Sequence, residues 1–106
     1  MERIDRLNEF LKESPDDSFL QHALALEYIK LGNDKEAGKL FYKILEKEPG
    51  YLGSYYHLGK LLERKKDITE ALRIYEKGME IASLKNDRHS YNELFAAYEE
   101  LKDETE

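Results

Sequence analysis

Three histidines, His22, His57 and His89, are the side chains in this sequence best suited to bind a metal or move a proton. A neutral imidazole is a good zinc ligand, so a metal site built from these three is one functional alternative. Their spacings of 35 and 32 residues provide no HxxxH or HxxE pair. Helical metal sites are usually built from such local pairs. The pattern therefore favours polar surface or groove residues, with metal binding as the weakest alternative.

The other residue types that catalyse reactions lack the motifs that would activate them. No nucleophile elbow surrounds a serine, and no glycine-rich phosphate loop is present. The chain has no cysteine, so a thiol nucleophile, a disulfide and a zinc-thiolate site are all excluded. We therefore expect no enzyme activity and no cofactor. The four serines considered as nucleophiles are Ser18, Ser54, Ser83 and Ser90.

The charge balance also restricts the class of partner. The chain of 106 residues carries 17 basic and 23 acidic side chains, a net charge of −6. Nucleic acids and membrane surfaces select basic faces, so neither is an expected partner. The N-terminus has no apolar signal-peptide core, and no apolar run approaches the length of a membrane span. These features predict a soluble protein, which we expect in the cytoplasm.

An internal period of 34 residues organises the chain. Shifting the sequence by 34 places aligns residues of similar type, and it also superposes the turn GNDKEA on KDITEA. Repeats of this length are typical of stacked helical units. The aligned pairs are Leu24 with Leu58, Ala25 with Gly59, Ala37 with Ala71, Phe41 with Tyr75, Leu45 with Met79 and Pro15 with Pro49.

Each repeat predicts two helices joined by a tight turn. In the first, Leu24, Ala25, Tyr28 and Leu31 recur at helical spacing, and Gly32 ends the helix. Asn33 with Glu36, and Asp67 with Glu70, predict capping boxes for the second helices. Helices joined so closely need a small residue at their crossing. We expect Ala25 to face Ala37 there, and Gly59 to face Ala71.

This pattern resembles the tetratricopeptide repeat family, in which a 34-residue helix-turn-helix unit closes with a proline. The resemblance predicts an all-α solenoid of six helices in a single domain, 1–106. Its parts are an N-terminal helix (1–15), two repeats (18–51 and 52–85) and a C-terminal capping helix (86–106). Three positions depart from the family pattern, namely Gln21, Ile44 and Ser83, which replaces the second closing proline. Its loss predicts a helix from Thr69 to about Leu84, and a next helix beginning near Asn86 or Asp87.

The resemblance implies binding of a protein or peptide in a concave groove lined by the first helix of each repeat. The carboxylate clamp of chaperone-binding members is absent, because His22 and Leu26 occupy its Lys and Asn places. The predicted groove residues are Phe19, His22, Leu26, Ile29 and Lys30, then Tyr56, His57, Lys60, Glu63 and Arg64, then His89, Asn92, Glu93 and Ala96.

Two features of this groove have competing interpretations. Leu26 and Ile29 lie off the apolar stripe of their helix, so they either form an apolar shelf for a partner or pack internally. The basic cluster around Lys60 and Arg64 could meet an acidic peptide. Favourable placement of cations at a helix C-terminus explains the cluster better.

The C-terminal stretch YNELFAAYEEL predicts a helix that caps the array. Phe95 occupies the place held by Ala25 and Gly59, and we expect its ring to fold over the site of a missing partner helix. A second functional alternative follows if Phe95 is exposed. The protein would then self-associate through this helix or the apolar shelf, and we expect either a monomer or a weak homo-oligomer.

Overall fold

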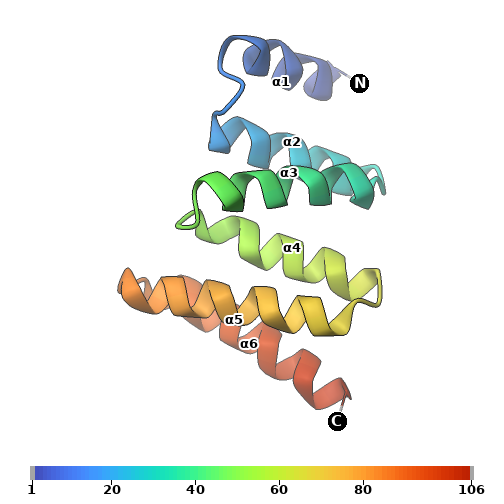
Figure 1. Ribbon diagram of the computed structural model, residues 1–106. Helices are drawn as coiled ribbons and strands as arrows, with labels where there is room; N and C mark the ends of the chain where they lie inside the picture. The colour runs from blue at the N-terminus through green and yellow to red at the C-terminus, as the bar shows by residue number, and fades with distance from the viewer. Residues whose placement is uncertain (1, 106) are drawn as a thin grey trace. The chain divides into compact units, whose positions relative to one another are not determined.

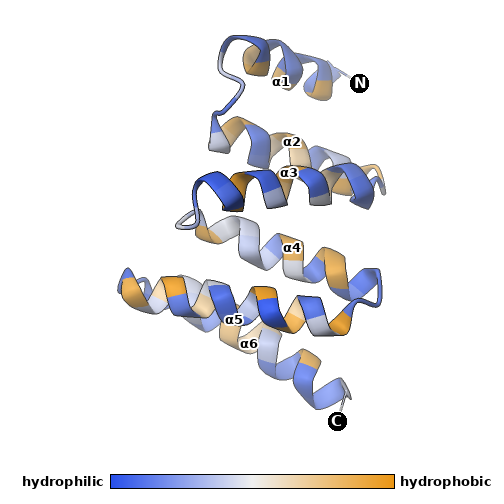
Figure 2. Cartoon of the chain, viewed as in Figure 1, coloured by the Kyte–Doolittle hydropathy of each residue, from blue (hydrophilic) through white to orange (hydrophobic). Residues whose placement is uncertain are grey.

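The computed structural model describes residues 2–105, and these form six α-helices with no β-strand among them (Figure 1). The first and last residues of the expected domain, 1 and 106, lie outside this range. Each helix carries both hydrophobic and hydrophilic residues (Figure 2), and each buries at least one side chain. No helix within 2–105 is long and apolar enough to cross a membrane. The helices are α1 (Glu2–Glu13), α2 (Ser18–Lys30), α3 (Asp34–Lys47), α4 (Leu52–Arg64), α5 (Ile68–Leu84) and α6 (Arg88–Thr105).

The all-α prediction and the six predicted helices are confirmed. The chain forms two compact units, one ending at Glu48 and the other beginning at Pro49. In the first unit α2 packs against both α1 and α3, and in the second the helices α4, α5 and α6 pack together. The expectation of one domain over the whole chain stays a prediction.

The turns inside the hairpins follow the capping prediction in part. Asn33 Oδ1 accepts a hydrogen bond from the Glu36 N–H at 3.3 Å, and Asp67 Oδ1 accepts one from the Glu70 N–H at 3.4 Å. The N–H of Asp67 does not need the Glu70 side chain, because it donates to the Leu62 carbonyl at 3.0 Å. Glu70 instead binds Arg73 through both carboxylate oxygens. In each expected capping box the side chain of the N-cap residue accepts a bond from the backbone. The N–H of the same residue donates to a carbonyl of the preceding helix and closes that helix.

Replacing Asp67 with alanine should lower the free energy of unfolding by about 1 kcal/mol, because the Glu70 N–H loses its acceptor. Chemical denaturation with circular dichroism measures this change. Thr69→Ala, an exposed substitution in the first turn of the same helix, is the matched control and should change stability by less than about 0.5 kcal/mol. Equal effects of the two variants would contradict the assigned cap.

The start of each first helix is tied to the preceding proline by the same side-chain bond. In the second unit the Tyr55 hydroxyl donates to the Pro49 carbonyl at 2.6 Å. In the first unit Gln21 stands 34 positions earlier, and its Nε2 donates to the Pro15 carbonyl at 2.8 Å. Gln21 is 1% exposed. The departure from an aromatic at this position therefore preserves the hydrogen bond and changes only the group that makes it.

Close packing of α4 and α5 depends on Gly59. A Cβ atom at this position would lie 2.1 Å from Cε1 of the Tyr75 ring. The expectation that Gly59 marks a close crossing is confirmed, and the three atoms nearest to the added Cβ all belong to the Tyr75 ring. That Ala71 also faces Gly59 stays a prediction. Gly78 has the same role where α4, α5 and α6 meet, since a Cβ there would lie 2.8 Å from the Cβ of Tyr55 and 2.9 Å from Leu94 Cδ1.

Leu31 is one predicted core residue that the structure contradicts. Leu24 and Ala25 are buried, but Leu31 is 48% exposed. It is the C-cap of α2, and Gly32 follows it with a positive φ of 77°. The helical periodicity that predicted burial ends at this point, so the side chain of Leu31 is no longer directed at the packed face.

Candidate functional site: the outer faces of α2 and α4

The predicted binding residues of the first unit lie on α2, and they differ widely in exposure. Phe19 is 61% exposed, whereas Leu26 and Ile29 are half-buried. His22 is half-buried as well, and its ring meets the buried Phe41 ring edge-on with centroids 5.6 Å apart. This contact makes His22 part of the packing between α2 and α3 as well as part of the surface.

Lys30, the cation predicted for this face, is engaged within the chain. Its Nζ lies 3.0 Å from Glu27 Oε2, and Nε of Arg3 on α1 lies 3.1 Å from the same oxygen. The hydrogen bond from Lys30 is the main cause that lowers the pKa of Glu27 below its usual value of 4.5, and Arg3 adds to it. Glu27 therefore offsets one of these two positive charges, and a net positive charge remains on this part of the face.

The second unit presents a mixed aromatic and charged cluster on α4, formed by Tyr56, His57, Lys60 and Glu63. The Lys60 ammonium lies 5.7 Å from the centroid of the Tyr56 ring, within cation–π range, and 3.7 Å from Glu63 Oε2. The Tyr56 and His57 rings meet edge-on at 5.5 Å. All four side chains are half-buried, so they are held in place and still reach solvent.

Glu63 connects this α4 cluster to the core of the hairpin. Its carboxylate accepts a hydrogen bond from the hydroxyl of Tyr75, a fully buried residue of α5. Burial is the main cause that raises the pKa of this hydroxyl, and the bond to Glu63 raises it further. The hydroxyl therefore remains a proton donor, which fixes the position of the carboxylate beside Lys60.

His57 is the histidine whose ionisation the structure changes. Burial lowers its pKa below 6.5; Arg64 lowers it further, while the charge of Glu93 on α6 acts in the opposite direction. The folded protein thus binds this proton only at a lower pH than the unfolded chain. The stabilising contribution of neutral His57 is complete above pH 6.5 and is lost as the pH falls through the folded pKa.

We predict that His57→Gln makes the melting temperature less sensitive to acid. Wild-type protein should lose stability between about pH 7.5 and 5.5 more steeply than the variant, because only the wild type has to protonate a buried imidazole. NMR titration provides the direct measurement, and the midpoint of His57 should lie below 6.5. A midpoint above that value would show that Glu93 outweighs burial.

The remaining predicted residues lie on α6. His89, Asn92, Glu93 and Ala96 are all exposed. No group of three or more His, Cys, Asp or Glu side chains within the described residues could hold a metal ion, so the three histidines do not form a ligand set. That the residues of α2, α4 and α6 bind a partner stays a prediction.

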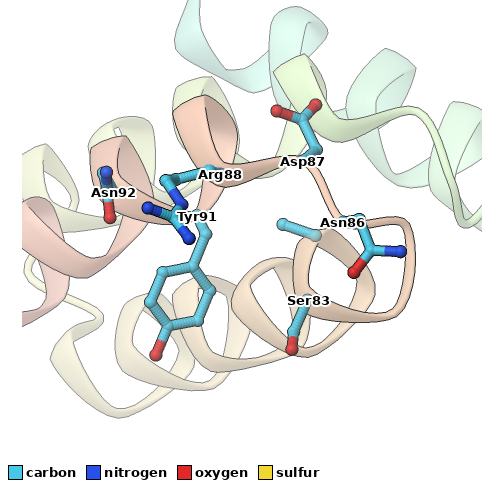
Figure 3. Close-up of a pocket in the computed structure, with 7 residues that line it drawn as sticks. Ser83, Asn86, Asp87, Arg88, Tyr91 and Asn92 are labelled. Carbon is cyan, nitrogen blue, oxygen red and sulfur yellow. The ribbon is translucent and has the colours of Figure 1, made fainter.

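A hollow of about 380 Å³, which the sequence did not indicate, lies at the junction of α5 and α6. In Figure 3 Arg88, Tyr91 and Asn92 project from α6, while Ser83 and Asn86 come from the end of α5 and the turn after it. Asn86 has a positive φ of 56°, which turns the chain into α6. Asp87 caps α6, since it accepts hydrogen bonds from the Ser90 N–H and hydroxyl at 3.0 and 2.8 Å. Of the predicted site residues, only Asn92 lines this hollow.

The helix at this junction follows the prediction made from Ser83. The helix α5 continues without a proline to Leu84, and α6 begins at Arg88 after the Asp87 cap. The signal that could have indicated the hollow is the polar run NDR after an uninterrupted helix. This signal is weak, because the same residues are typical of any turn.

Comparison with known proteins agrees with the repeat pattern. The tetratricopeptide repeat model matches residues 52–83. The crystal structure of a tetratricopeptide repeat domain protein from Salinibacter ruber is 37% identical in sequence, covers 81% of this chain and 96% of its own, and has a TM-score of 0.78. A TPR repeat-containing protein of Pseudomonas aeruginosa is 24% identical over 91 residues, which are 86% of this chain and 87% of that protein.

The fold extends to more distant proteins. The TPR2B domain of yeast Sti1, solved in a complex with pHsp70, is 21% identical, covers 95% of this chain and 81% of its own, and has a TM-score of 0.87. At this identity the likeness concerns the fold alone. The Salinibacter protein, in contrast, is similar in both sequence and structure over most of both chains. The chain therefore belongs to the tetratricopeptide repeat family.

Proposed function

We propose that this protein is a non-catalytic interaction module that binds a protein or peptide through the predicted groove residues of α4, and separately through those of α2. The observation that supports this proposal is the cluster of Tyr56, His57, Lys60 and Glu63. Its aromatic and charged groups are held in place by contacts with one another and still reach solvent. A helix face that only meets water needs no such arrangement. Aromatic rings beside fixed charges are typical of residues that anchor a bound segment.

Two proteins of the same fold support a protein or peptide as the class of ligand. The TPR2B domain of Sti1 was solved with pHsp70, and the first TPR of Spaghetti (RPAP3) was solved with the HSP90 peptide SRMEEVD. Both are about one-fifth identical to this chain, so they suggest the class of ligand and not its sequence. We expect a protein or peptide partner, no nucleic acid, no cofactor and a cytoplasmic location.

The chemistry of the two faces indicates the kind of segment that would fit. On α2 the accessible groups are Phe19 and the half-buried Leu26 and Ile29, and Lys30 shares the Glu27 carboxylate with Arg3. On α4 the accessible groups include Lys60 and Arg64 beside Glu63. We therefore expect one apolar anchor for α2, and a polar or acidic stretch for α4, in place of the terminal carboxylate that a clamp would require.

A display selection tests the proposal. A library of peptides is selected on the immobilised protein, and the enriched peptides are measured by calorimetry against variants. Tyr56→Ala and Lys60→Glu should each weaken binding about tenfold or more. Lys77→Glu carries the same charge change on an exposed position of α5 and should leave affinity unchanged. Peptides that bind all three variants equally well would contradict the proposal.

A further inference from the structure

Six exposed residues of α6 lie opposite its buried side, and two of them, Arg88 and Asn92, also line the hollow beside α5. The buried residues of α6 are Leu94, Ala97 and Leu101. On the opposite side, all within about a third of the helix circumference at 100° per residue, lie six exposed residues, which we name the outer α6 stripe. These are Arg88, Asn92, Phe95, Ala96, Glu99 and Asp103.

Phe95 forms the apolar centre of this stripe. It was expected to fold over the place of a partner helix, and this prediction is wrong. Its ring is 44% exposed and stacks on Tyr91 of its own helix, with centroids 6.2 Å apart and planes 9° from parallel. A helical side chain leans towards the preceding turn, which explains the position of the ring over Tyr91. Ala96 beside it is small and exposed, so the projecting Phe95 ring lies next to a position where another ring could pack.

The charges of α6 are distributed against its own dipole. The first turn contains Arg88 and His89 and no acid, whereas the last two turns contain four acids and one lysine. A helix on its own is stabilised by the opposite arrangement, with acids at its N-terminus and cations at its C-terminus. Asp87 places one negative charge at the N-terminal cap of α6. Its carboxylate already accepts hydrogen bonds from the N–H and the hydroxyl of Ser90. Lys102 lies over the ring of its own Tyr98, 5.4 Å from the centroid.

We propose that the outer α6 stripe binds the same stripe of a second copy, with the two helices antiparallel. The two-fold axis would pass between Phe95 and Ala96, so that each ring packs over the alanine of the other copy. Arg88 is seven residues before Phe95 and Asp103 is seven residues after Ala96. Antiparallel pairing about this axis therefore brings Arg88 of one copy to Asp103 of the other, twice.

This pairing resolves the charge distribution of the single helix. The acidic C-terminal end of each α6 would lie beside the N-terminal end of its counterpart, where both Arg88 and the dipole are positive. Within residues 2–105, Arg88 and Asp103 form no ion pair, so both remain available. A two-fold interface must be complementary to itself, and this stripe meets that requirement in both shape and charge.

The expected association is weak. One pair of helices buries less than the roughly 1,200 Å² of stable interfaces, and the net charge of −6 on each chain opposes dimerisation. Sedimentation equilibrium of the full chain, over about 10 µM to 1 mM, should show a monomer and dimer in exchange. Phe95→Ser should raise the dissociation constant at least about tenfold. A wild type that stays monomeric throughout, or a dimer that Phe95→Ser leaves unchanged, would overturn the proposal.

Charge exchange provides the decisive experiment. Arg88→Glu and Asp103→Arg should each raise the dissociation constant about fivefold, because each homodimer then contains two repulsive contacts. Each should also make the monomer slightly more stable, since both changes favour the helix dipole. An equimolar mixture of the two variants should dimerise like wild type, because every contact is again between opposite charges, and so should the double variant.

Lys77→Glu on α5 is the matched control for Arg88→Glu and should not alter dimerisation. A mixture that does not regain the dissociation constant of the wild type would overturn the antiparallel pairing. The stability measured for each variant shows whether it is folded, so this result would not be a loss of folding. An equal effect of Lys77→Glu would show that only net charge matters, and this would also overturn the proposal.

Discussion

Substitution of Gly59 by valine is expected to lower the free energy of unfolding by about 3 kcal/mol, at the upper end of the usual cost of overpacking a core. The first carbon added at this position would lie 2.1 Å from Cε1, 2.5 Å from Cζ and 2.7 Å from Cδ1 of Tyr75. The ring cannot move aside easily, because it is fully buried and its hydroxyl is held by Glu63.

A graded series makes this prediction more specific. Gly59→Ala should cost less, about 1 to 2 kcal/mol, because alanine gains about 1 kcal/mol over glycine as a helix former. In the first unit Ala25 stands at the position of Gly59, and Phe41 stands at the position of Tyr75. Both are buried, so a hairpin of this kind can hold one methyl group beside an aromatic ring. Thermal and urea unfolding followed by circular dichroism measure both variants.

Gly53→Ala is the matched control for this series, since Gly53 is exposed on the same helix. It should leave stability unchanged or raise it by up to about 1 kcal/mol. If Gly59→Val had the same midpoint urea concentration of unfolding as the wild type, the close contact between Gly59 on α4 and Tyr75 on α5 would be contradicted.

Removal of α6 should have the largest effect of all. A chain that ends at Leu84 loses the buried side chains of Leu94, Ala97 and Leu101, and it uncovers the surface at Gly78 and Tyr55 where Leu94 packs. Each large core side chain contributes about 2 to 5 kcal/mol, so the loss should be about 5 kcal/mol or more. Repeat arrays need a cap over their last apolar face. Without α6 that face is exposed, so we also expect the truncated chain to aggregate.

Differential scanning fluorimetry and light scattering measure the two effects of this truncation. A chain that ends at Leu101 is the control, because it removes the exposed residues Lys102 to Thr105 and keeps the buried side chains of α6. It should melt close to the full chain. An unchanged melting temperature after truncation at Leu84 would contradict the role of α6 as a cap.

The helices were predictable because they depend on local signals. Gly32 and the caps at Asn33 and Asp67 each act within a few residues of the position they specify, and the 34-residue period repeats such signals in the second unit. The boundaries of α5 and the start of α6 followed from one missing proline, and they agree with the structure to within two residues. Leu31 was the exception, since periodicity alone does not indicate where a helix face stops being covered.

The details of the site were less predictable because they depend on contacts between helices. Gln21 was identified as a departure from the family pattern, but its bond to the Pro15 carbonyl requires the folded turn. Glu63 was predicted as a groove residue without its bond to Tyr75, which stands twelve positions later on the next helix. Phe95 was placed at the correct point of its helix, and its orientation was wrong because the ring has a nearer surface on Tyr91.

NMR chemical-shift mapping of a selected peptide on the 106-residue chain shows directly which helices bind it. We expect the peptide to shift amide signals of α2 or α4, with the largest changes around Tyr56, His57 and Lys60. In Lys60→Glu the same shifts should need about tenfold or more peptide to saturate, whereas Lys77→Glu should titrate like the wild type. Shifts confined to α5 or to the outer α6 stripe, or a Lys60→Glu titration that matches the wild type, would contradict binding at the predicted residues of α2 and α4.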